Sequence, residues 1–349
     1  MKKQTQKAGD ESVNVQAESI TINTGLSVSD AREIAIGVFR ENFLELRDEA
    51  ADVAFERARV FTDDLVEKLA AEPGLLDAAR DPDYQYGLFT AQREYARTGD
   101  DDLGATLTDL LVRRAGHNER TLLQVALNEA IPTVGKLTSD QFSILSVLFL
   151  VRYTHWGAIV DFAALASMLD ESIGPFIDDL PPTLASLQHL EYAGCGSIGI
   201  GEIRIEEAFS KAYPGTFSKG LTVEQKDEFI ASQPDDSLPP DLFIPHHTEP
   251  ELFRLSSPDQ QSVGYAEEIG VLGPEQAKAV LEILEKQRLK GEAASVALAA
   301  CSPLAERLIS IWNESSLKNT TLTSVGIAIG HSNFRRATGK EPDLAIWLK

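Results

Sequence analysis

The chain has 349 residues, of which 43% are hydrophobic and 25% charged, a composition typical of globular proteins. Its 54 acidic and 32 basic residues give a net charge of −22, which opposes binding to nucleic acid or to an anionic membrane. No run of 18 apolar residues occurs, and no apolar segment follows the basic start, so we expect a cytoplasmic protein with no membrane partner. Cys195 and Cys301 lie far apart and form no CxxC metal pair.

Residues 1–26 form a polar leader. Val13, Val15, Ile20 and Ile22 alternate there with polar residues, and this period of two indicates a strand. The leader has too few apolar residues to form a core alone. We therefore expect a β-strand leader that pairs with other strands or stays disordered.

Residues 27–132 are predicted to form a helical domain that begins with one long helix. From Ser29 onward, apolar residues recur at spacings of three or four until Pro73 and Gly74 end the pattern. The helix would be about 60 Å long at about 1.5 Å of rise per residue. Its seam is rich in Ala and Phe and is not strictly heptad, which favours packing in a bundle over a free coiled coil. Three shorter helices are expected to follow, at 82–99, 103–114 and 119–131.

Residues 133–231 are predicted to form a second, winged-helix-like domain. Helices are expected over 139–153, 162–169 and 183–192, and a glycine-rich segment over 194–205 is expected to be a β-hairpin. Three helices followed by a hairpin is the order of a winged-helix module.

The remaining residues divide into a linker and a C-terminal part. Prolines crowd residues 232–262, which we interpret as a Pro-rich loop or linker. Residues 263–349 are expected to supply C-terminal helices and a terminal strand at 344–348 that pack on the domain of 133–231. The predicted fold class is thus mainly α, a helical bundle with a long N-terminal helix plus a winged-helix-like C-terminal part with minor β structure.

Two motifs with known chemistry are better explained as ordinary structure. Gly194, Gly196 and Gly199 match GxGxxG, but a predicted helix precedes them where a dinucleotide fold needs a strand. His246 and His247 have the chemistry of metal ligands, but their Pro-rich segment lacks a spacing that fixes geometry. We therefore assign no catalytic residue, no metal and no cofactor.

One cluster near the C-terminus remains a candidate site. His331, Asn333, Arg335 and Arg336 fall within two helical turns, and arginine makes bidentate contacts with oxyanions. Residues 318–349 carry five basic side chains against two acidic ones, unlike the acidic remainder of the chain. These four residues are our candidates for binding an anion or a partner. The alternative is that the arginines pair with the acidic body.

Two stretches carry a resemblance to known proteins. The start VNVQAESITINTGLSVSDAREIA and the end LTSVGIAIGHSNFRRATGKEPDLAIWL resemble the two ends of an uncharacterised family of bacterial proteins, and YPGTFSKGLT at 213–222 fits the same family. More loosely, the helix led by LTSDQ, the later LASLQHLEYAG and the C-terminal LTSVGIAI resemble the layout of Abi-alpha type abortive-infection proteins. That similarity implies a role in phage defence and assigns no functional residue.

These observations predict a non-enzymatic interaction or assembly protein of the bacterial cytoplasm, acting in phage defence. We expect it to form a homo-oligomer and to bind an unidentified protein partner. The alternatives are an enzyme such as a nuclease or nucleotide hydrolase, and a winged-helix regulator that binds nucleic acid. Nucleic acid is a candidate partner only for the basic C-terminal patch, because the rest of the chain is strongly acidic.

Overall fold

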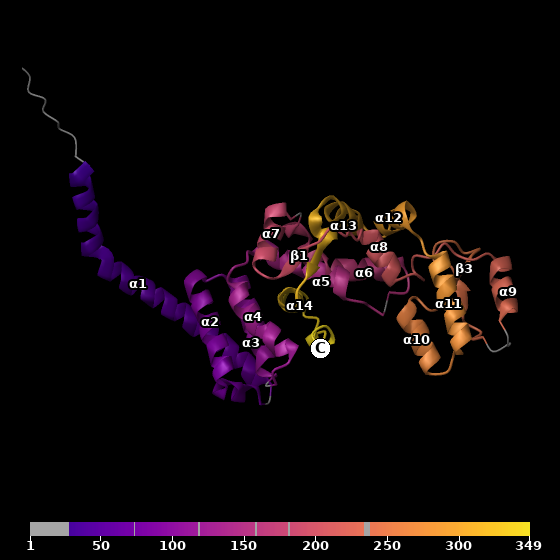
Figure 1. Ribbon diagram of the computed structural model, residues 1–349, viewed down its shortest axis with the longest axis horizontal. Coiled ribbons are helices and arrows are strands. Elements are labelled where there is room, and N and C mark those ends of the chain that lie inside the picture. The colour runs from indigo at the N-terminus through magenta and orange to yellow at the C-terminus, as the bar shows by residue number, and fades with distance from the viewer. Residues whose placement is uncertain (1–27, 73, 118, 158, 181, 234–237) are drawn as a thin grey trace, which may run out of the picture. The chain divides into compact units, whose positions relative to one another are not determined.

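The computed structural model describes residues 28–349 except positions 73, 118, 158, 181 and 234–237, and it describes side chains from Arg47 onward. The predicted β-strand leader, residues 1–26, lies outside the described residues. The chain divides into two units, Met1–Val53 and Ala54–Lys349. In the first unit the described structure is the N-terminal part of helix α1 (Val28–Ala71). All other elements belong to the second unit (Figure 1).

The second unit is mainly helical, as the sequence predicts. Helix α5 (Ser139–Tyr153) has the predicted bounds, and the other predicted helices agree to within a few residues. The helices that follow α1 are α2 (Pro82–Thr98), α3 (Asp101–Ala115), α4 (Leu122–Val134), α5, α6 (Phe162–Ser172), α7 (Leu184–Tyr192), α8 (Ile205–Ala212), α9 (Val223–Ser232), α10 (Gln260–Glu268), α11 (Pro274–Gln287), α12 (Gly291–Ala299), α13 (Pro303–Glu314) and α14 (Ser324–Thr338). The sequence did not predict α8, α9, α10 and α12.

Side-chain caps explain where several helices begin. Asp81 accepts a hydrogen bond from the amide of Asp83 at the start of α2, and Asp100 accepts one from Leu103 at the start of α3. Helix α4 continues to Val134, three residues past its predicted end, because Pro132 lies in the last turn and so interrupts few backbone hydrogen bonds.

Helix α14 is the central helix of the second unit. It packs against α5, α3 and α4 (Figure 1). Its residues 325–334 are all buried. Helix α5 is equally enclosed, with residues 141–150 buried on every side. The main hydrophobic core therefore forms around two helices that are far apart in the sequence. Phe61, Leu65 and Leu69 on α1 extend this core toward the N-terminus.

The predicted β-hairpin at 194–205 is wrong. Strand β1 (Gly196–Ile198) pairs antiparallel with β4 (Thr320–Leu322), from the C-terminal part of the chain, with Ser197 opposite Thr321. The second half of the predicted hairpin bonds to the same C-terminal segment, because the amides of Gly199 and Ile203 donate to the carbonyls of Asn319 and Lys318. The strand partners are thus distant in sequence, and the expected winged-helix hairpin does not form.

The predicted terminal strand is also wrong. Residues Leu344–Ile346 form a short 3₁₀ helix, and the Asp343 carboxylate accepts a hydrogen bond from the amide of Ala345 at its start. Leu344 and Leu348 are buried in the main core. The apolar tail is therefore docked by its side chains and forms no ladder with a described strand.

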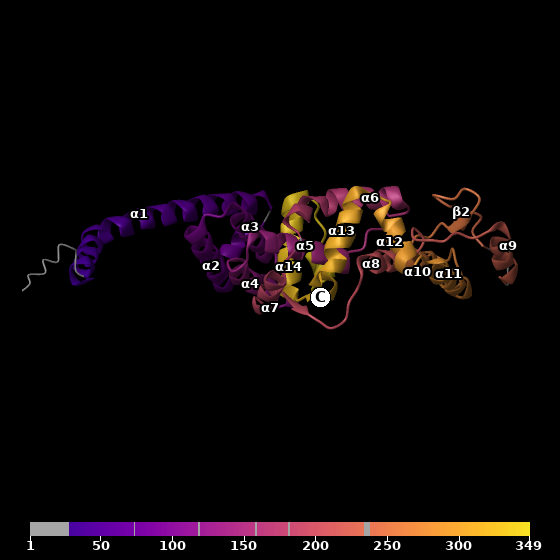
Figure 2. The same ribbon diagram turned by 90° about the horizontal axis from the view of Figure 1, so that it is seen from above.

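Residues around the predicted linker build a second, smaller core. The segment 232–262 contains strand β2 (Phe243–Pro245), strand β3 (Phe253–Leu255) and the start of α10, and β2 and β3 pair antiparallel. Figure 1 shows β3, α9, α10 and α11 gathered together, and Figure 2 shows β2 with the same helices. We call this part the small lobe. Its buried residues are Phe229, Leu242, Leu255, Val263, Leu272, Ala277, Val280 and Leu284.

The strands β2 and β3 were not predicted, because each has only three residues and the segment around them is rich in proline, which leaves too short a run for an alternating apolar pattern. No helix in the described part of the chain combines the length and apolar character needed to cross a bilayer.

Candidate functional site

The four residues predicted to form a binding cluster separate into two pairs. His331 and Asn333 point into the body of the protein, with 0% and 1% of their surface exposed. Arg335 and Arg336 lie at the surface end of α14, where about a quarter and a third of each side chain is exposed. The helix therefore brings only the two arginines to a place that a ligand could reach.

The buried His331 has a structural environment. Its Nε2 atom donates to the carbonyl oxygen of Pro342 at 2.8 Å, and its ring packs edge-on against Phe149. Its Nδ1 atom is buried and has no partner among the described residues. Burial lowers the pKa of His331 to about 4, and the nearby Arg113 adds to this effect. The ring is thus neutral at pH 7 and attaches the C-terminal segment to α14.

Asn333 connects the core to Arg336. Its side-chain amide donates to the hydroxyl of Ser146 on α5 at 2.9 Å, and its carbonyl oxygen accepts from Arg336 at 2.9 Å. Arg336 also forms an ion pair with Asp102 at 2.8 Å. Asn333 therefore positions Arg336 and lies below the accessible surface.

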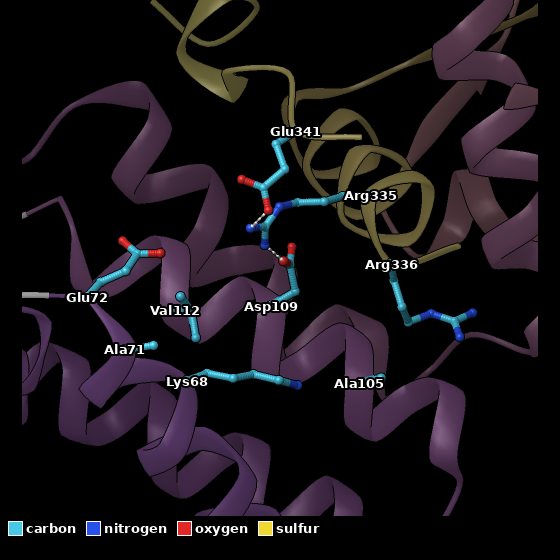
Figure 3. Close-up of a pocket in the computed structure, with 9 residues that line it drawn as sticks. All are labelled: Lys68, Ala71, Glu72, Ala105, Asp109, Val112, Arg335, Arg336 and Glu341. Atoms are coloured by element: carbon cyan, nitrogen blue, oxygen red, sulfur yellow. Dashed lines mark hydrogen bonds and ion pairs between the residues drawn. The ribbon is translucent and has the colours of Figure 1, made fainter. Parts of the chain in front are cut away.

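Arg335 forms ion pairs with Asp109 on α3 and with Glu341 (Figure 3). Asp109 also accepts hydrogen bonds from Arg113 at 3.2 Å and from the hydroxyl of Ser332 at 2.7 Å. Both carboxylate oxygens of Asp109 are thus occupied by donors, one by Arg335 and the other by Arg113 and Ser332. A carboxylate held in this way is not free to act as a general base.

These charged residues border a cavity of about 370 Å³. Figure 3 shows side chains from α1, α3, α14 and the C-terminal segment around it, with Arg335 and Arg336 leaving α14 in different directions. We call this the α14 cavity, and it lies within the second unit. Its lining residues are Lys68, Ala71, Glu72, Ala105, Asp109, Val112, Arg335, Arg336 and Glu341.

The charges of the α14 cavity are balanced before any ligand arrives. The Lys68 ammonium lies 2.9 Å from the Asp64 carboxylate. Arg335 pairs with Asp109, and Arg336 pairs with Asp102. An incoming anion would compete with these carboxylates, whereas a protein surface with both charged and apolar groups could match the cavity without breaking them. The arrangement is thus suited to recognition of a mixed surface.

The other basic residues of the C-terminal segment are paired in the same way. Lys318 lies 3.2 Å from Glu202, and Lys340 lies 3.1 Å from Glu171. Acidic residues elsewhere in the chain therefore offset most of the positive charge of residues 318–349. This is the alternative given in the sequence analysis, in which the basic residues pair with the acidic body.

Sequence reasoning missed the residues that complete the α14 cavity. Lys68, Asp109 and Glu341 come from three separate segments, and only the packing of α14 on α3 brings them beside Arg335. The excess of acidic residues indicates that the arginines have carboxylate partners. With 54 acidic residues in the chain, however, the sequence does not identify which carboxylate pairs with which arginine.

Comparisons with known proteins give the family of the chain. Neither a curated protein nor a solved structure matches it. The looser similarity to abortive-infection proteins is not shown by any of these comparisons. A family model matches residues 25–348, and the chain therefore belongs to that uncharacterised family.

Proposed function

We propose that this chain is a non-enzymatic assembly protein that associates with further copies of itself through helices α1 and α2. The observation that carries the proposal is a strip of large apolar side chains exposed along the two helices. The strip consists of Phe55 and Val66 on α1, and Tyr86 and Phe89 on α2, which are 72%, 47%, 72% and 62% exposed.

The packing of α1 on α2 places Val66 and Phe89 side by side. Gln92 on α2 donates to the Thr62 hydroxyl on α1 at 2.9 Å, and Arg57 bonds to the carbonyl of Ala96, so the helices run antiparallel. Val66 follows Thr62 by one turn, and Phe89 precedes Gln92 by about one turn. Both side chains therefore lie at the same level of the helix pair.

The strip extends from this point along both helices. Phe55 precedes Val66 by eleven residues, which is about three turns of helix, so the two share one face of α1. Tyr86 and Phe89 are three residues apart on one face of α2. Exposed large apolar side chains that gather on one face of a protein are typical of interaction sites.

The neighbouring charges on α1 are paired within the helix. Arg59 forms ion pairs with Glu56 at 2.6 Å and Asp63 at 2.8 Å, and Lys68 forms one with Asp64. A partner therefore has few unpaired charges to neutralise at the strip, and a second copy supplies a matching apolar surface. In a two-fold dimer each strip would contact its equivalent.

The charge distribution favours this function over nucleic-acid binding. The regulator alternative needs Arg335 and Arg336 to contact phosphates, but each of these side chains has a carboxylate partner. The net charge of −22 also opposes approach of a polyanion.

The test is the mass of the full-length protein in solution, measured by light scattering at tens of micromolar. We expect an oligomer whose affinity rises with salt, because salt screens the repulsion between acidic chains. The double variant Phe55→Glu/Phe89→Glu should dissociate, because it puts charge into an apolar contact. Tyr192→Glu is the matched control, since Tyr192 is 86% exposed on α7 and lies outside the strip. A monomeric wild-type protein in low and high salt overturns the proposal.

We further propose that assembly serves phage defence, as the layout of the sequence implies. Cells that express the wild-type chain should resist infection better than cells that express the dissociated double variant. Equal protection by the two proteins would separate the defence role from self-association, and no protection by the wild type would reject the defence role.

A further inference from the structure

Two basic side chains near the small lobe are enclosed without a hydrogen-bond partner. Arg254, on β3, is 6% exposed, and its Nε and Nη1 atoms are buried and unpaired among the described residues. Both ring nitrogens of His247 are buried and unpaired in the same sense. Most buried polar atoms in proteins are satisfied, so four unsatisfied nitrogens on neighbouring residues need an explanation.

The guanidinium of Arg254 accounts for most of the free-energy cost of burying these unpaired nitrogens. A buried charge without a partner is strongly destabilising, which is why buried arginines usually contact a carboxylate or a phosphate. Burial lowers the pKa of Arg254, and the nearby carboxylate of Asp161 offsets part of that effect. Arg254 forms no ion pair with Asp161 or with any other described residue. The charge of Asp161 nevertheless affects the pKa of Arg254.

The ring of His247 is held in place by its neighbours. Its centroid lies 4.5 Å from that of His246 in a stacked arrangement and 4.9 Å from that of Phe162 in an edge arrangement. Burial lowers the pKa of His247 to about 4, and His246 and Arg254 contribute in the same direction. At neutral pH the ring is therefore uncharged and offers one N–H donor and one acceptor nitrogen.

His246 is excluded as a ligand by its own bonds. Its Nε2 atom donates to the Ser218 carbonyl at 3.1 Å, and its Nδ1 atom accepts from the amides of Thr248 and Glu249. In the described part of the chain no three His, Cys, Asp or Glu residues are grouped so that they could hold a metal ion. The unpaired nitrogens of Arg254 and His247 therefore call for an anionic acceptor.

Asp161 adds an acceptor to this group. It caps α6 through one oxygen, which accepts from the amide of Ala164 at 2.8 Å. Phe162, the residue after Asp161, contacts the ring of His247 at 4.9 Å, so the start of α6 lies beside His247. Arg254 lies on β3, which pairs with β2 just before His247 in the chain. A ligand that satisfies all three side chains must accept from Arg254 and His247 and be able to donate to the second carboxylate oxygen of Asp161, the one that does not cap α6.

We propose that Arg254, His247 and Asp161 form a binding site for a protonated phosphate group, either inorganic phosphate or a phosphate monoester. Arginine is suited to phosphate recognition, and a neutral imidazole can donate without adding a second positive charge. Inorganic phosphate keeps a P–O–H group near neutral pH that can donate to Asp161, and a phosphate monoester, whose second pKa is about 6, keeps one as its monoanion. Sulfate and carboxylates have no such proton, so the site discriminates against them. The proposal is independent of self-association through α1 and α2.

The test is binding of inorganic phosphate to the full chain, measured by calorimetry at pH 6.5 and constant ionic strength. We expect saturable binding, with sulfate about tenfold weaker or more, because one charged hydrogen bond distinguishes the two ions. Glycerol 3-phosphate in a parallel titration identifies the source of the group, since tighter binding of the ester assigns the site to a monoester. Absence of saturable phosphate binding, or equal binding of sulfate, overturns the proposal.

Three variants connect the binding to these residues. Arg254→Gln should weaken phosphate binding about tenfold or more. Asp161→Asn keeps a good helix cap but replaces an acceptor with a donor, so it should lower the preference for phosphate over sulfate. Arg288→Gln is the matched control, because Arg288 is also 6% exposed but is already paired with Glu285 at 2.8 Å. Unchanged binding in Arg254→Gln contradicts the proposal, and Asp161→Asn keeps the test valid if Arg254→Gln does not fold.

Discussion

Gly326 on α14 lies directly against the backbone of Cys195, so closely that a β-carbon at position 326 would stand 1.8 Å from the Cys195 carbonyl oxygen. The same oxygen accepts a hydrogen bond from the amide of Thr323, just before α14 begins, at 3.0 Å. One turn later, a β-carbon at Gly330 would stand 2.6 Å from the carbonyl oxygen of Leu145 on α5. Two glycines thus allow the central helix to touch two separate backbone segments.

Gly326→Ala should destabilise the protein by about 3 kcal/mol, because backbone cannot move aside as a flexible side chain can. The matched control is Gly264→Ala in α10, where nothing lies within 4 Å of the added carbon. That change should stabilise the protein by about 0.5 to 1 kcal/mol through the lower entropy of the unfolded chain. Urea unfolding of the two variants measures both values, and the same sign of effect for both would contradict this explanation.

Arg114 joins α3 to the start of α2 and to α4. Its guanidinium, with the side chain 1% exposed, donates to Asp81 at 2.9 Å, to Asp83 at 2.8 Å and to Asn128 at 2.8 Å. Arg114→Met should cost about 3 kcal/mol in the free energy of unfolding, because it leaves acceptors of both carboxylates unpaired. Arg114→Lys should have an intermediate effect, since an ammonium group cannot reach all these acceptors at once.

Low pH should remove part of the contribution of Arg114 to the free energy of unfolding. Its hydrogen bond lowers the pKa of Asp83 below the ordinary value of 3.8, and Asn128 contributes in the same direction. Because the folded-state pKa is the lower one, the stabilisation is complete above pH 3.8 and is lost as the pH falls through the folded-state value. The difference in stability between wild type and Arg114→Met should therefore shrink in that acidic range. A difference that stays constant down to pH 2 would contradict the role of Asp83.

His331 should make the protein less stable at mildly acidic pH. Its pKa is about 4 in the folded protein, whereas the ordinary value for histidine is 6.5. The unfolded chain therefore binds the proton first as the pH falls. The stabilisation is complete above pH 6.5 and is lost progressively between 6.5 and 4, by an amount on the order of 3 kcal/mol.

His331→Phe is the variant that tests this pH dependence. It keeps a ring beside Phe149 but cannot titrate, so its stability should change less than that of the wild type between pH 7 and pH 4.5. The variant should be less stable than wild type at pH 7, because the Pro342 carbonyl loses its donor. Equal pH dependence of the two proteins, measured by urea unfolding at several pH values, would show that His331 is not the titrating group.

Trp347 docks the C-terminal segment on α5. Its ring centroid lies 4.9 Å from that of Phe149, and its indole N–H donates to the carbonyl of Tyr153. Trp347→Ala should cost about 3 kcal/mol, and Trp347→Phe about 1 kcal/mol because it removes mainly the hydrogen bond. Thermal unfolding measures both changes, and an unchanged melting temperature in Trp347→Ala would show that the docking does not contribute to stability.

The sequence by itself determined the elements whose information is local. The spacing of apolar residues predicted α1 and α5 because a helix buries one face or all of its surface at a fixed period. The start of α2 at residue 82 was predicted correctly, because Asp81 and Pro82 are an acceptor side chain followed by proline, a pair that suits the first turn of a helix. These signals act within a few residues and need no knowledge of the rest of the fold.

Only the tertiary structure decided the contacts between distant segments. The partner of β1 is β4, more than a hundred residues later in the chain, and the sequence around Gly199 does not identify it. The pairing of Arg335 with Asp109 likewise depends on α14 packing against α3. Strand pairing uses backbone groups and ion pairing uses charged side chains, and many segments of the chain have both. Which segments pair is therefore decided by the geometry of the assembled core, and the local spacing of residues does not encode that geometry.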